Sequence, residues 1–174
     1  LFPYTTLFRS EFHEMTLEEA EDSFVTMEET IAYIEDLPLP TVGVINGPAM
    51  GAGLELALAC DLRIGSENAK MGIPVGSLGI TLNNQFAHRL VTLLGPSVTK
   101  ELVYTGKILG ANEAEEKGLL NRLVSAKELD RAAIEMGKLI SLQSPASLMA
   151  IKKSVAECTN SVKQLWDEPT PFVH

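Results

Sequence analysis

The amino-acid sequence predicts one globular domain of the α/β class. An amphipathic segment near its start has the three- and four-residue spacing of a helix, an apolar run rich in β-branched residues follows with the character of a strand, and glycine and proline divide the remainder into helical segments. The chain has 174 residues, of which 45% are hydrophobic and 21% charged, so it is long enough for one sizeable core. This composition excludes collagen, coiled coils and disordered chains.

The first regular element predicted is an amphipathic helix, or two, over residues 16–34. Thr16 and Glu19 have the spacing of a capping box, in which each residue satisfies a free backbone amide of the other. The sequence Leu-Pro-Leu-Pro at 37–40 must end this helix, because proline lacks an amide proton and biases the preceding residue toward an extended shape. The apolar positions that define the helical spacing are Leu17, Ala20, Phe24, Met27, Ile31 and Ile34.

A strand, a glycine turn and a second helix are predicted next. Residues 41–45 are apolar and β-branched, which favours a buried strand, and residues 54–59 are strong helix formers. The glycines at 47, 51 and 53 predict a flexible turn between them. Residues 62–64 predict a further short strand.

The C-terminal half is predicted to be mainly helical. Gly95-Pro96, Gly106, Gly118 and Ser144-Pro145 separate its segments, and Pro145 stands at a first-turn position where its missing amide proton has little cost. The predicted helices cover residues 97–104, 111–117, 126–141 and 145–157.

The charge pattern argues against a nucleic-acid partner. The net charge is −9, and the excess lies in residues 11–36, which contain many acidic residues but no lysine or arginine. Such a run is typical of a solvated helix face, and no basic tract exists to neutralise phosphates. The apolar stretch 42–60 contains turn glycines, a proline and one carboxylate, so we expect no membrane span either.

The cysteines and histidines predict neither a disulfide framework nor a metal site. Cys60 and Cys158 are far apart without CxxC spacing, which suggests a reducing compartment and a cytoplasmic location. His13, His88 and His174 are too scattered to resemble a known metal motif, so no metal is expected.

Glu55 is the main candidate for a functional side chain. It is the single charged residue between 42 and 60, and an unpaired buried carboxylate costs several kcal/mol, so it must pair, protonate or face a cleft. Isolated acids of this kind are functional candidates. The alternative is a structural acid at the start of a helix, where it stabilises the helix dipole by roughly 0.3–1 kcal/mol.

The sequence around Glu55 closely resembles the signature of the enoyl-CoA hydratase/isomerase, or crotonase, superfamily. The segment from Pro40 to Asp61 reads PTVGVINGPAMGAGLELALACD, and the resemblance extends over about 120 residues, from 38 to 158. Further matches are Arg63-Ile64, Ala69 to Pro74, Leu78-Gly79, Arg89-Leu90, Leu94-Gly95, Leu102 to Gly106 and Ala114 to Val124.

The resemblance implies a spiral of strand-strand-helix units with helices packed outside, assembled as homotrimers or hexamers. It implies an acyl-CoA thioester as substrate and no separate cofactor, since CoA is part of that substrate. Two backbone amides of this family hold the thioester carbonyl as an oxyanion, and the position of one of them is Ala52, next to Gly51 in the same turn. Glu55 matches the first of the two carboxylates that family hydratases use.

The sequence departs from the family pattern at several pocket positions. Val75 stands where hydratases have their second carboxylate, and a hydrocarbon side chain cannot transfer a proton. Asn83 and Asn84 replace a glycine-rich turn; they are candidates for pocket residues, although asparagine is also favoured at turns and helix caps. His88 is expected on a packed helix face rather than in the site.

Three functions therefore stay open on the sequence alone. A hydratase would need a replacement for the second carboxylate, an isomerase or decarboxylase needs only one proton-transfer residue, and a CoA-binding or oligomer-stabilising protein would use neither. Residues 1–10 resemble a translated sequencing adapter, so we expect a non-native segment there and a domain truncated at both ends. The expected organisation is a partial crotonase domain over 11–158, with a spiral core at 37–92, a helical part at 93–158 and a tail at 159–174. Such a fragment would lack part of its site.

Overall fold

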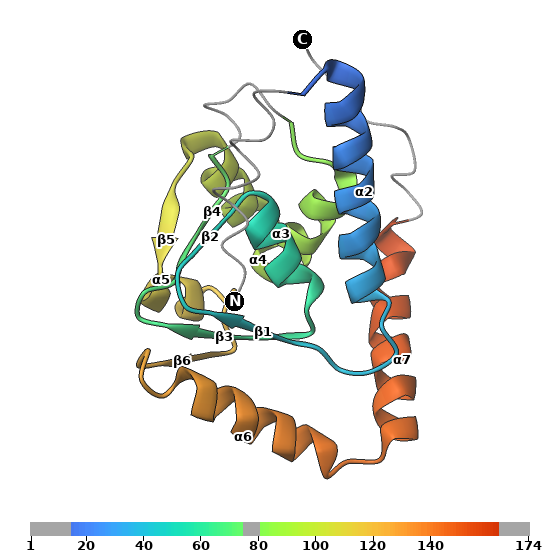
Figure 1. Ribbon diagram of the computed structural model, residues 1–174, viewed down its shortest axis with the longest axis vertical. Coiled ribbons are helices and arrows are strands. Elements are labelled where there is room, and N and C mark those ends of the chain that lie inside the picture. The colour runs from blue at the N-terminus through green and yellow to red at the C-terminus, as the bar shows by residue number, and fades with distance from the viewer. Residues whose placement is uncertain (1–14, 75–80, 164–174) are drawn as a thin grey trace.

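The computed structural model describes residues 15–74 and 81–163, and in this part of the chain helices surround two small sheets (Figure 1). Its elements, in chain order, are α2 (Leu17–Glu35), β1 (Val42–Ile45), β2 (Pro48–Met50), α3 (Ala52–Ala59), β3 (Leu62–Ser66), β4 (Lys70–Gly72), α4 (Asn84–Thr105), β5 (Ile108–Gly110), α5 (Ala111–Glu116), β6 (Arg122–Val124), α6 (Leu129–Ser141) and α7 (Pro145–Lys163).

The chain alternates between the two sheets as it advances. The first sheet has the strand order β1-β3-β6 and the second has the order β2-β4-β5. β1 pairs in parallel with β3, with Val42 opposite Leu62, and β2 pairs in parallel with β4, with Pro48 opposite Lys70. β5 is antiparallel to β4. One strand in each sheet followed by a helix, and then again one strand in each sheet, is the strand-strand-helix spiral that the family resemblance implies.

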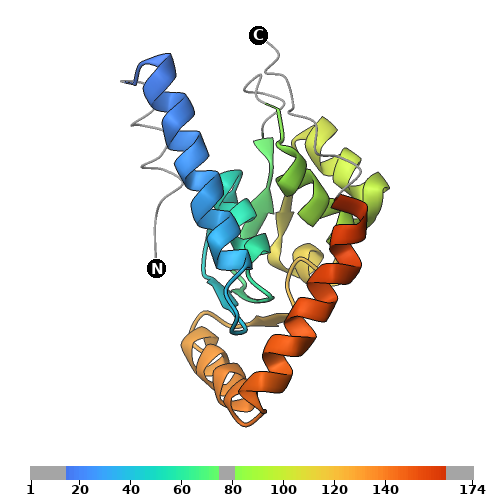
Figure 2. The same cartoon turned by 90° about the vertical axis from the view of Figure 1, so that its right-hand side faces the viewer.

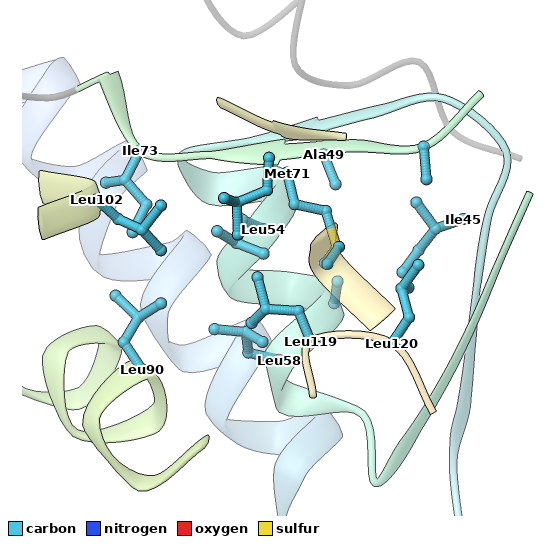
Figure 3. Close-up of a cluster of buried hydrophobic side chains, with 14 of the residues drawn as sticks. Ile45, Ala49, Leu54, Leu58, Met71, Ile73, Leu90, Leu102, Leu119 and Leu120 are labelled. Atoms are coloured by element: carbon cyan, nitrogen blue, oxygen red, sulfur yellow. The ribbon is translucent and has the colours of Figure 1, made fainter. Parts of the chain in front are cut away.

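The main core lies between the second sheet and helices α3 and α4 (Figure 3). Leu54 and Leu58 of α3 point toward Met71 of β4 and Leu90 of α4, and all four side chains are buried. A smaller cluster around Ile64 lies where α6 covers the first sheet. Figure 2, in which the side carrying α2 and α7 faces the viewer, shows α6 and α7 joined as a V below the sheets. The apolar side chains of α3 are therefore packed within the core.

The first predicted segment, one amphipathic helix or two, is a single helix in the structure. α2 is capped by Thr16, whose hydroxyl accepts from the Glu19 amide while the Glu19 carboxylate accepts from the Thr16 amide at 2.8 Å. α4 differs more from its prediction, because it starts at Asn84 rather than near residue 97. Its backbone leaves helical geometry only at Gly95, where φ is +73°, next to Pro96.

The short strands are the main elements that residue patterns do not predict. β2, β4, β5 and β6 each have three residues, too few to show the two-residue alternation of a strand. β2 occupies the middle of the predicted glycine turn, so that turn is partly wrong. β5 and β6 lie within the segment 93–158, and each pairs with a strand from the segment 37–92.

The burial predicted for residues 41–45 is correct only in part. Ile45 is buried, but Val44 is 44% exposed. Among the described strands β1 pairs only with β3, so it forms an edge of its sheet. None of the helices within 15–74 and 81–163 is long and apolar enough to cross a bilayer.

Candidate active site

Glu55 lies in the first turn of α3 and is almost fully buried, with 2% of its surface exposed. The helix begins after Gly51, whose φ of +51° favours glycine. The Gly51 amide donates to the Gly72 carbonyl at 3.0 Å, which ties the turn to β4. Ala52 follows as the first helical residue, so its amide has no acceptor within the helix. A carboxylate and an available amide thus stand three residues apart at one helix N-terminus.

Arg89 of α4 is the cationic partner of Glu55. Its Nη1 donates to Glu55 Oε1 at 3.0 Å, and its Nη2 donates to Glu35 Oε2 at 2.6 Å. The Arg89 and Glu55 side chains are buried, with 5% and 3% exposure, whereas the Glu35 side chain is 40% exposed. Arg89 therefore connects a buried carboxylate with one at the surface.

Asn83 forms the second contact of Glu55 and also begins α4. Its Oδ1 accepts from the Phe86 amide at 2.6 Å, which is the geometry of a helix N-cap. Its Nδ2 donates to Glu55 Oε1 at 3.3 Å and also to Glu28 Oε1. Asn83 therefore caps α4 with its oxygen and contacts Glu55 with its nitrogen.

Burial first, and then the nearby negative charge of Glu28, together raise the pKa of Glu55 to about 7 against the opposing effects of Asn83 and Arg89. Burial also raises the pKa of Glu28, and its hydrogen bond from Asn83 opposes that change. A carboxyl group with a pKa near 7 is present in both protonation states at neutral pH. It is therefore suited to accept and return a proton.

The structure brings some of the predicted site residues together. Gly51, Ala52 and Glu55 share the start of α3, and Asn83 contacts Glu55. Asn84 is the first residue of α4 and is exposed. Val75 lies outside the described residues.

Three charged neighbours of this site are missing from the sequence prediction: Glu28, Glu35 and Arg89. The acidic run 11–36 suggests a solvated helix face, and most of its described acids are indeed exposed, but Glu28 and Glu35 are half-buried and face the site. The sequence contains a signal for their position, because the two acids stand three residues before and four residues after Ile31, one of the apolar positions of the helix. Ile31 is 3% exposed in the structure. Such spacing places all three on the packed face of the helix.

His88 and the possibility of a metal site complete the comparison with the sequence predictions. His88 lies in α4, as predicted, with Nε2 3.2 Å from the Thr159 carbonyl oxygen of α7. Across residues 15–74 and 81–163 no group of three or more histidine, cysteine, aspartate or glutamate side chains is arranged to hold a metal ion.

Comparison with known proteins identifies the family. Residues 8–167 match the family model described as enoyl-CoA hydratase/isomerase. The chain is 45% identical over 126 residues to an Arabidopsis thaliana protein named probable enoyl-CoA hydratase 2, mitochondrial, a match that covers 72% of this chain and 42% of the relative. It is 34% identical over 146 residues to a short-chain-enoyl-CoA hydratase of Clostridium acetobutylicum, covering 84% of this chain and 56% of the relative.

The fold gives the same result. The crystal structure of enoyl-CoA hydratase from Bacillus anthracis is similar with a TM-score of 0.79 and 34% identity, over 84% of this chain and 57% of that one. The chain spans about half the length of the curated relatives it matches. It belongs to the enoyl-CoA hydratase/isomerase family and has the crotonase fold.

Proposed function

We propose that the protein acts on acyl-CoA thioesters by forming and protonating a thioester enolate, with Glu55 as the proton-transfer residue. The observation that carries this proposal is the position of Glu55, buried at the start of α3 three residues after the Ala52 amide, with a pKa of about 7. Enolate chemistry needs a base of that kind and a hydrogen-bond donor for the oxyanion.

The proposed reaction begins when the Glu55 carboxylate removes a proton from the α-carbon of the thioester. The C–H electron pair then moves onto the thioester oxygen, where the Ala52 amide and the positive end of the α3 dipole stabilise the negative charge. Return of a proton to carbon reverses the step or completes a rearrangement. CoA belongs to the substrate, so this scheme needs no separate cofactor.

Isomerisation or decarboxylation is favoured over hydration by the valine at position 75. Hydration requires a water molecule to be activated as well as a proton to be delivered, and Val75 offers no acid at the place where family hydratases have one. A noncatalytic CoA-binding role is the remaining alternative, and the Arg89–Glu55 ion pair is the observation in its favour.

The test uses the longest open reading frame that contains residues 11–158. Exchange of the α-proton of a saturated acyl-CoA for deuterium, followed by NMR, should occur with the wild type and fall roughly 10²–10⁴-fold in Glu55→Gln, while acyl-CoA affinity changes little. Glu29→Gln, the same change at an exposed position of α2, serves as the matched control. Unchanged exchange in Glu55→Gln would make Glu55 a structural acid, and binding without exchange in the wild type would support the noncatalytic role.

The assembly and the location of the protein stay predictions. The resemblance implies a homotrimer or hexamer, which light scattering can measure. The scattered cysteines suggest a cytoplasmic location.

A further inference from the structure

We propose that Glu28 is a second proton-transfer residue of this site, and that Asn83 positions Glu28 and Glu55 as a pair of unequal carboxyl groups. This inference rests on the proposed function and adds the reaction to it: the shift of a double bond in a 3-enoyl thioester to the 2-position. Glu28 would do the work for which the sequence offers no acid at position 75.

The first argument is the fixed orientation of the Asn83 amide. Its carbonyl oxygen is occupied by the Phe86 amide at the N-cap of α4, so its NH2 group must point the other way. Both Glu28 Oε1 and Glu55 Oε1 accept from that Nδ2 atom. Two carboxyl groups from helices α2 and α3 are therefore brought to the two hydrogens of a single nitrogen.

The second argument is that the two carboxyl groups have different surroundings. Glu55 is paired with Arg89, whereas within residues 15–74 and 81–163 Glu28 has no cationic side chain at ion-pair distance. The negative charge of Glu28 raises the pKa of Glu55, because ionisation of one neighbouring carboxyl group disfavours ionisation of the other. When the pair holds one proton, one member is an acid and the other is a base.

The third argument is a buried donor that no residue within 15–74 and 81–163 satisfies. The Arg89 residue is only 6% exposed, and its Nε is buried without a hydrogen-bond partner in the described part of the chain. Buried donors are nearly always satisfied, so an acceptor that the described residues do not supply is expected at this place. The donor belongs to the same guanidinium that holds Glu55, which puts the expected acceptor beside the carboxyl pair.

The proposed isomerisation is balanced by the two acids. When the proton of the pair lies on Glu28, the Glu55 carboxylate takes the α-proton of the 3-enoyl thioester, and the C–H electron pair forms a dienolate whose charge rests on the thioester oxygen. Glu28 in its acid form then gives its proton to the γ-carbon: the O–H bond breaks, a C–H bond forms and the double bond moves to the 2-position. Glu55 ends protonated and Glu28 ionised, and proton exchange between them restores the starting state.

The experiment compares two reactions in the protein from the longest open reading frame containing residues 11–158. One is α-proton exchange of a saturated acyl-CoA, which needs only Glu55 and the oxyanion donor. The other is conversion of a 3-enoyl-CoA into the conjugated 2-enoyl-CoA, followed by its ultraviolet absorbance. The variants are Glu28→Gln and Glu55→Gln, with Glu29→Gln as the control. Glutamine at 28 retains an oxygen acceptor for Asn83 but carries no acidic proton.

We expect Glu28→Gln to lower isomerisation by roughly 10²-fold or more, and by at least tenfold more than it lowers α-proton exchange. Glu55→Gln should lower both. Equal losses of the two reactions in Glu28→Gln would reduce Glu28 to an electrostatic neighbour and overturn the inference, and so would exchange without isomerisation in the wild type. Neither reaction in the wild type would instead overturn the proposed function.

A second variant addresses the pairing directly and covers the case in which Glu28→Gln does not fold. Asn83→Ser keeps an N-cap oxygen for Phe86 but removes both amide donors. It should preserve the thermal transition and lower isomerisation by at least about tenfold more than exchange. If Asn83→Ser isomerises the 3-enoyl-CoA like the wild type, Asn83 does not position the pair.

Discussion

The protonation of Glu55 should make the folded chain less stable as the pH rises. Its ion pair with Arg89 alone would give the opposite dependence. Burial raises the pKa of Glu55 from 4.5 to about 7, although Arg89 lies 3.0 Å away. A carboxyl group with a raised folded pKa binds its proton more tightly when folded. Its contribution to stability is therefore complete below pH 4.5 and is lost as the pH rises through 7.

The magnitude follows from the size of the shift. A change from 4.5 to about 7, at 1.36 kcal/mol per pH unit, corresponds to a loss on the order of 3 kcal/mol between low and high pH. About 2 kcal/mol of that loss should fall between pH 5.5 and 8. This range keeps the protein above its isoelectric point of about 4.8, where a low net charge promotes association.

The assay is urea unfolding of the wild type and of Glu55→Gln, followed by circular dichroism at intervals from pH 5.5 to 8. The difference between their free energies of unfolding isolates the ionisation of position 55, since the other titrating groups are shared. We expect the wild type to lose about 2 kcal/mol relative to the variant as the pH rises. A constant difference would mean that the pKa is not shifted, and a change of opposite sign would mean that the ion pair with Arg89 outweighs burial.

Three other changes test further parts of the structure. Arg89→Met should destabilise the fold by about 3 kcal/mol at pH 8 and by less at pH 5.5, because Glu55 can then be neutralised by protonation; urea unfolding at both values checks this, and an equal loss would contradict it. Gly65→Ala should lower the free energy of unfolding by about 1–3 kcal/mol, because a Cβ there would lie 2.5 Å from Leu120 Cδ1 in the core. Gly137→Ala in α6, where a Cβ would have nothing within 4 Å, should raise it by up to about 1 kcal/mol. Equal shifts of the two thermal transitions would refute this. Val75→Glu should create or increase hydration of a short 2-enoyl-CoA, measured by loss of its conjugated absorbance, and no gain would mean that position 75 does not control the reaction.

Residue patterns predict the long elements of this fold but not its short ones. α2 could be predicted because a capping box marks its start and its apolar spacing continues along its length. β4 and β5 could not, because a three-residue strand is defined by the partner it pairs with rather than by its own sequence. The resemblance supplied the spiral, which no local pattern reveals.

The site was predictable to a similar degree. Glu55 could be selected as a candidate because a single acid in an apolar stretch is visible in the sequence itself. Its partners come from α2 and α4, and Arg89 is 34 residues away, so only the packing of three helices brings them together. Asn83 could be predicted as a cap or as a pocket residue, but the sequence does not reveal that it caps α4 and also contacts Glu28 and Glu55.

The pairing of the strands also determines how the chain must reach this structure. In the described part of the chain β4 and β5 are the one pair of consecutive strands that bond to each other, and α4 separates them. The shortest connection between paired strands, from Val42 to its partner Leu62, passes through the other sheet and through α3. No hairpin can therefore form early and act as a nucleus, and every sheet contact must wait for a sizeable loop to close. Helices such as α2 can form within microseconds, whereas the sheets should assemble late and together. A newly synthesised chain would consequently expose its apolar strands for most of its folding time, which makes aggregation during synthesis its principal hazard.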